Sequence, residues 1–157
     1  MRNIYLIASF LFVFANTSFA QDVANGTPSV MIESSSQYGF AETVDKLTAS
    51  IMAKNWKLII THNMQETMKK NGKDVYPVKI LELCNPEIAY TILASDVNRS
   101  LSAMLPCRIS VYEKADGKTY VSRMNIPLLV EMIKGDASQS IMRAYNESEE
   151  FIRGVSE

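Results

Sequence analysis

Residues 78–87 read VKILELCNPE, and this stretch does the most to decide the fold. Its first six residues place apolar side chains on both faces of an extended chain, which predicts a central β-strand. Asn85 is a good helix N-cap, Pro86 suits the first helical position, and Glu87 complements the helix dipole. The stretch therefore predicts a buried strand that leads directly into a helix ending near Ala94.

Upstream of this stretch, hydrophobic spacing predicts four further elements. They are a strand at 30–33, a helix at 39–55, a strand at 57–61 and a short helix at 63–70. Gly39 followed by Glu42 resembles a weak capping box at the start of the longer helix.

Downstream, strands at 108–114 and 118–124 flank a three-residue loop that ends at Gly117. With Gly117 in the left-handed conformation, Val111 would lie opposite Val121.

The C-terminal part is predicted to be helical, with Asp136 and Gln139 able to cap the helix. No internal repeat or linker interrupts the chain. The pattern predicts one α+β domain over 30–154, with an antiparallel-rich sheet of about five strands and helices packed on one face.

The first 20 residues have the three parts of a secretory signal. Arg2 supplies a positive charge, an apolar run covers 4–15, and 18–20 read Ser-Phe-Ala. The apolar run is too short for a bilayer, which takes about 20 residues. We therefore expect a signal peptide at 1–20, a flexible leader at 21–29 and a periplasmic or secreted protein.

The charge balance does not support nucleic-acid binding. The chain has 16 Lys and Arg against 17 Asp and Glu, a formal net charge of −1, and its basic residues are scattered. Nucleic-acid binding needs concentrated positive charge, so it is not expected. No second long apolar run follows the signal, so no membrane span is expected after cleavage.

Three side chains are candidates for chemistry: His62, Cys84 and Cys107. Cys84 directly precedes a predicted helix N-terminus, which can lower the pKa of a thiol and favour a catalytic thiolate. A nucleophile also needs a base, and His62 is a candidate only if the fold brings it close. A buried cysteine that merely packs is the simpler interpretation.

Two other interpretations of the same residues stay open. Cys84 and Cys107 could form a disulfide, since an exported chain with an even number of cysteines favours one. Alternatively, His62, Met64, Cys84 and Cys107 offer imidazole, thioether and thiolate ligands for a metal ion or for haem iron. No further cofactor is indicated by a motif.

Several segments in order resemble one known family. They are GFAET at 39–43, ILELCNP at 80–86, LPC at 105–107 and YEKADGK at 112–118. Over roughly 29–133 the chain resembles the bacterial and archaeal domain-of-unknown-function family numbered 302. The resemblance implies a compact α+β domain that tends to form homodimers and has no settled activity. It also implies a branch with two cysteines, and His62 occupies the place of a histidine found in another branch.

The leading hypothesis from the sequence is a non-enzymatic binding or sensing module. Its small ligand, metal or haem would lie near Cys84, Asn85, Cys107 and His62. The second hypothesis is a thiol-dependent redox or transfer enzyme in which Cys84 attacks. The third is an interaction protein with structural cysteines.

Overall fold

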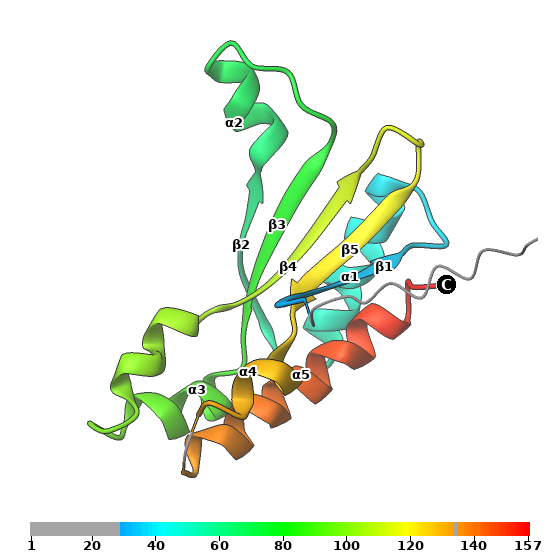
Figure 1. Cartoon of the computed structure of the whole chain (residues 1–157). Helices are drawn as coiled ribbons and strands as arrows, with labels where there is room; N and C mark the ends of the chain where they lie inside the picture. The colour runs from blue at the N-terminus through cyan, green and yellow to red at the C-terminus, as the bar shows by residue number, and fades with distance from the viewer. Residues whose placement is uncertain (1–28, 134) are drawn as a thin grey trace, which may run out of the picture.

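The computed structural model describes residues 29–133 and 135–157. An antiparallel sheet with the strand order β1-β5-β4-β3-β2 forms its centre (Figure 1). The strands are β1 (Met31–Ser35), β2 (Lys57–Asn63), β3 (Val78–Cys84), β4 (Cys107–Glu113) and β5 (Thr119–Met124). The predicted α+β fold with a five-stranded antiparallel sheet is confirmed. The predicted signal peptide and all but the last residue of the predicted leader lie outside the described residues.

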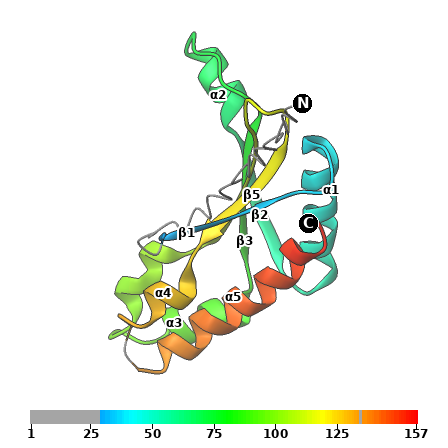
Figure 2. The ribbon, with the colours of Figure 1, turned by 45° about the vertical axis from the view of Figure 1, so that its right-hand side comes forward.

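The helices are distributed over one face and both ends of the sheet. They are α1 (Phe40–Ala53), α2 (Met64–Lys70), α3 (Pro86–Leu93), the 3-10 helix η1 (Arg99–Met104), α4 (Ile126–Val130) and α5 (Ala137–Arg153). Helices α1 and α5 cover one face, whereas α2 projects beyond one end of β2 and β3 (Figure 2). Helices α3, η1 and α4 gather at the opposite end. Among the described residues, no helix combines the length and the apolar character that crossing a bilayer requires.

Local sequence signals explain most element boundaries. The side-chain oxygen of Asn85 accepts from the backbone N–H of Glu87 at 3.1 Å and of Ile88 at 3.4 Å, so the predicted cap of α3 is confirmed. Gly117 has a φ of 74°, and Val111 pairs with Val121, as predicted for the β4–β5 hairpin.

Two predicted caps are wrong. Helix α1 starts after Gly39 without a side-chain cap, because glycine has no side chain to complete a box with Glu42. Asp136 precedes α5 but makes no capping bond. Its carboxylate instead accepts from the side-chain amide of Asn98 at 3.1 Å.

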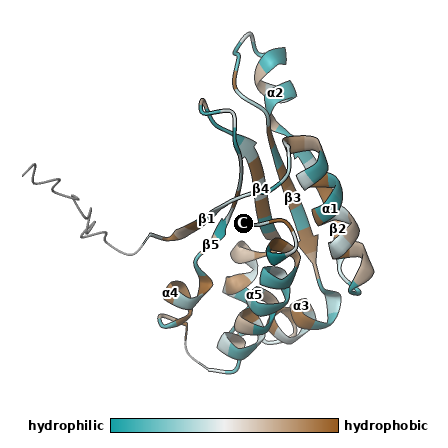
Figure 3. Cartoon of the chain, turned by 90° about the vertical axis from the view of Figure 1, so that its right-hand side faces the viewer, coloured by the Kyte–Doolittle hydropathy of each residue, from teal (hydrophilic) through white to brown (hydrophobic). Residues whose placement is uncertain are grey.

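Strand alternation separates the two faces of the sheet. The inner face, toward α1 and α5, holds fully buried apolar side chains, and Figure 3 shows hydrophobic residues along β3 and β4. These core residues include Leu81, Leu83, Ile109, Val111 and Val121 from the strands. Burying each such side chain stabilises the fold by about 1.5–3 kcal/mol.

The outer face of the sheet is polar and partly exposed. Tyr112 and Tyr120 stack there with their ring centroids 6.1 Å apart. Glu33 of β1 accepts hydrogen bonds from Tyr112 and, at 2.5 Å, from Lys114. The two faces thus have different chemistry, and the functional residues divide between them.

Candidate functional site

A small cavity lies at the end of the sheet where β3 and β4 meet α3, η1 and α5. Its volume is about 60 Å³, and most of the side chains that line it are apolar. Cys84, Asn85 and Cys107 all line this cavity. Arg108 marks its solvent side, because the side chain is 61% exposed. The structure therefore brings three of the four predicted ligand-binding residues together.

The strand register places the backbones of the two cysteines side by side. Cys84 is the last residue of β3, and Cys107 is the first residue of β4. In the antiparallel ladder Cys107 lies opposite Leu83, the residue next to Cys84. Both cysteines are free thiols in this structure. A disulfide between them stays a hypothesis, and their position at one cavity does not depend on it.

Burial governs the ionisation of both thiols. It raises the pKa of Cys84 above the ordinary thiol value of 9.0. Burial, followed by the nearby charge of an ionised Cys84, raises the pKa of Cys107 to about 11. The first free N–H groups of α3 donate to Asn85 rather than to a thiolate. Both cysteines are consequently protonated at neutral pH, which is unfavourable for a nucleophile.

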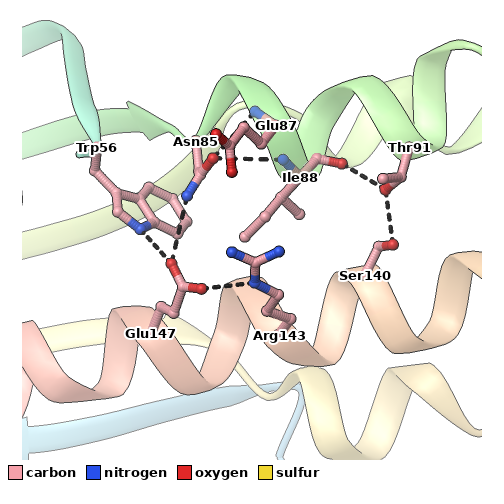
Figure 4. Close-up of polar contacts among 8 residues, drawn as sticks. All are labelled: Trp56, Asn85, Glu87, Ile88, Thr91, Ser140, Arg143 and Glu147. Atoms are coloured by element: carbon pink, nitrogen blue, oxygen red, sulfur yellow. Dashed lines mark hydrogen bonds and ion pairs between the residues drawn. The ribbon is translucent and has the colours of Figure 1, made fainter. Parts of the chain in front are cut away.

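A polar network holds the wall of the cavity between α3 and α5 (Figure 4). One carboxylate oxygen of Glu147 accepts from Trp56 Nε1 at 2.8 Å and from Asn85 Nδ2 at 3.4 Å. The other accepts from Arg143 Nε at 2.8 Å. Burial opposes ionisation of Glu147, but the hydrogen bonds from Trp56 and Arg143 outweigh it and lower its pKa. Asn85 thus caps α3 and at the same time connects it to α5.

Sequence reasoning missed a buried ion pair beside the cavity. Arg123 of β5 lines the cavity and has only 10% of its side chain exposed. Its guanidinium makes two hydrogen bonds of 2.7 Å to the carboxylate of Glu149 and one of 2.7 Å to Ser34 Oγ. The sequence did carry a signal for the inward position of Arg123. It follows Thr119 and Val121 at intervals of two residues, and alternate residues of a strand face the same side of the sheet.

His62 lies away from the thiols, on the outer face of the sheet. His62 pairs with Ile80, which precedes Cys84 by four residues on β3. At the usual rise of a strand, Ile80 and Cys84 are about 13 Å apart along β3. Its Nε2 is 3.3 Å from Glu82 Oε1, and Arg108 Nε donates to the same oxygen at 2.9 Å. His62 does not line the cavity and is not placed to act as a base for Cys84.

Met64 is also separate from the cavity. It is the first residue of α2, which projects from the end of the sheet opposite to α3. The predicted set of His62, Met64, Cys84 and Cys107 is therefore divided between two places. Among residues 29–133 and 135–157, no cluster of three or more His, Cys, Asp or Glu is arranged to hold a metal ion.

Fold and site together define a small antiparallel α+β domain with two thiols at one apolar cavity. The family model described as "Domain of unknown function DUF302" matches residues 32–155, so the chain belongs to the DUF302 family. An uncharacterized conserved protein DUF302 from Bacillus stearothermophilus has a similar structure, with a TM-score of 0.69 and 23% identity. That similarity covers 79% of this chain and 96% of the other protein, and at this identity it shows the fold alone. No curated protein matches the chain.

Proposed function

We propose that this protein is an exported binding or sensing module whose ligand occupies the cavity beside Cys84 and Cys107. The observation that supports this function is that Cys84, Cys107 and Asn85 all line one hollow whose walls are mostly apolar. Ligand sites typically combine such walls with a few convergent polar groups. The export part of the proposal rests on the predicted signal peptide.

The size of the cavity limits the ligand. Drug-sized ligands and cofactors occupy pockets of about 300–1,000 Å³. The cavity of about 60 Å³ is far smaller, so haem does not fit these residues. A ligand of a few atoms or a single metal ion matches the space better.

A thiol enzyme is the second candidate, because both cysteines are free thiols on neighbouring strands, and Cys107 lies opposite Leu83, the residue before Cys84. Burial raises the pKa of both thiols, and the base that the sequence suggested, His62, pairs with Glu82 on the other face. Catalytic cysteines need a thiolate at neutral pH. The binding module is therefore the function that the geometry supports better.

A loading experiment tests the proposed function. The mature chain, starting at residue 21, is incubated with the low-molecular-mass fraction of a bacterial periplasmic extract and weighed by native mass spectrometry. We expect a non-covalent added mass that Ala89→Leu abolishes, because Ala89 lines the cavity and leucine fills it. Ala49→Leu on the exposed side of α1 is the control and keeps the added mass. No added mass, or one that survives Ala89→Leu, would show that the cavity is not a binding site.

A further inference from the structure

The cavity at the end of the sheet has aliphatic walls that come from five elements. The elements β3, α3, η1, α4 and α5 each contribute such a side chain, namely Leu83, Ile92, Leu101, Ile126 and Ile141. Three of these side chains, Leu83, Ile92 and Ile141, are buried. Aliphatic groups neither donate nor accept hydrogen bonds, so these walls bind a guest through dispersion and the exclusion of water.

The polar side chains of the wall already have partners within the protein. Asn85 uses its side-chain oxygen for the start of α3 and its side-chain nitrogen for the link to α5. All three nitrogens of the Arg123 guanidinium donate to protein oxygens. Ser148 Oγ donates to the backbone carbonyl of Tyr145 at 2.8 Å. Across the described part of the chain, no buried side-chain nitrogen or oxygen lacks a partner. The wall therefore has no buried polar side chain that requires a ligand.

The groups that could carry charge are neutral or already paired. Both thiols are protonated at neutral pH, because burial raises their pKa. A protonated cysteine behaves as a small hydrophobe. Burial also raises the pKa of Tyr145, which keeps its hydroxyl neutral. Arg108, on the solvent side, already donates to Glu82. The described residues that line the cavity thus present no unpaired charge to a ligand.

We propose that the ligand of this cavity is a small saturated alkyl group, supplied by a free apolar molecule or by the end of an amphiphile. This inference rests on the proposed function and names the chemical class of its ligand. A buried water needs several polar partners, whereas apolar cavities stay dry and take up guests such as benzene or xenon. A metal ion or an anion would need ligands or charges that these neutral or paired side chains do not offer.

The volume of about 60 Å³ limits the length of the alkyl group. One water molecule takes about 30 Å³ in the liquid, and a methylene group is of similar size, so the cavity holds about two or three carbon atoms. Burying one methylene strengthens binding about fourfold. Affinity should rise by this factor with each carbon until the cavity is full. It should then level off, because further methylenes stay in water beside Arg108.

The test uses xenon and the straight-chain primary alcohols from methanol to hexanol as probes. They are added to the chain from residue 21 onward, and the signals of its isotope-labelled methyl groups are followed by nuclear magnetic resonance. We expect xenon to shift the methyl signals of Ile92 and Ile141, which line the cavity. We expect the affinity for the alcohols to rise about fourfold per carbon up to about propanol and then to level off.

Matched variants and one further probe sharpen the test. Ala89→Leu and Ala144→Leu fill the cavity from α3 and from α5, and each should weaken binding at least about tenfold. Ala49→Leu on the exposed side of α1 should leave it unchanged. Hexanoate distinguishes the two sources of the alkyl group. It binds if the cavity takes the end of an amphiphile, and it does not bind if the cavity takes only a free apolar molecule.

The xenon and alcohol titrations use the unaltered chain, so they remain decisive if a filling variant fails to fold. No xenon response at Ile92 and Ile141, or a response that both folded filling variants retain, would overturn the alkyl site. An added mass from the extract that Ala89→Leu abolishes, together with no response to xenon or the alcohols, would overturn the alkyl class and leave the proposed binding module standing. Neither an added mass nor a response would overturn both.

Discussion

Each face of the sheet carries an arginine–glutamate ion pair, and the two pairs differ in how far the arginine is buried. On the inner face, Arg123 and Glu149 pair with only 10% and 20% of their side chains exposed. On the outer face, Arg108 pairs with Glu82, and here 15% of the glutamate side chain but 61% of the arginine side chain is exposed. Because the residue types are the same, we expect the difference in burial to decide how much each pair contributes to stability. Burial likewise raises the pKa of both thiols.

Removing the inner acid should have the largest effect. Glu149→Ala leaves the charge of Arg123 buried without its carboxylate, which costs about 3–5 kcal/mol. Urea unfolding of the chain from residue 21 onward measures the loss of unfolding free energy. Glu82→Ala is the matched control, and it should cost clearly less because water reaches Arg108. Equal losses for the two variants would contradict the distinction between the faces.

The next largest effect concerns the reactivity of Cys107. In a Cys84→Ser variant, Cys107 is the remaining thiol, and burial is the first cause of its raised pKa of about 11. Relative to an ordinary thiol with a pKa of 9.0, its thiolate fraction at neutral pH falls about hundredfold. The charge of Cys84, the second cause, is absent from this variant, so iodoacetamide should modify the folded variant more slowly than the unfolded one by up to about a hundredfold.

The pH profile of the same reaction gives a second criterion. The rate should keep rising about tenfold for each pH unit beyond pH 9.0, as the raised pKa requires. A rate that levels off near neutral pH would contradict the burial argument and favour the thiol enzyme.

A moderate effect is expected at the wall of the cavity. Glu147→Ala removes the acceptor of Trp56 Nε1, a residue that is 2% exposed. An unsatisfied buried donor costs about 1–3 kcal/mol. Glu147→Gln keeps a carbonyl oxygen for the indole and should restore most of that loss. Denaturant midpoints compare the variants, and identical midpoints for Ala and Gln would show that the indole bond has no energetic role.

The smallest effect is expected for the ionisation of Glu82. The hydrogen bond from Arg108 holds the pKa of this carboxyl below its usual 4.5. A lowered pKa in the folded state adds stability above pH 4.5, which is lost as the pH falls through the folded-state pKa. Glu82→Gln should thus have a slightly lower thermal midpoint at neutral pH, and the two midpoints should converge in acid. A gap that widens in acid would have the wrong sign.

Local signals in the sequence predicted much of the fold and part of the site. Asn85-Pro86 predicted the start of α3, and Gly117 predicted the register of β4 and β5, because both signals act within a few residues. The strand ends also placed Cys84 and Cys107 at the same edge of the sheet.

The missed features depend on contacts between distant segments. Glu147 and Glu149 lie on α5, and their partners Trp56 and Arg123 come from elements that no local pattern connects to it. The separation of His62 from Cys84 likewise follows from the pairing of β2 with β3, which the sequence does not specify. Polar partners across the core require the tertiary structure.

The central claim is that Cys84 and Cys107 open into one cavity. A reagent with two alkylating carbons, small enough to join neighbouring thiols, tests this claim most directly when it is applied to the folded, reduced chain from residue 21 onward. We expect one intramolecular adduct per chain, found by peptide mass mapping as a link between Cys84 and Cys107, and a slower formation of that link after prior unfolding at the same low reagent ratio. Two separate single-ended adducts on the folded chain would contradict it.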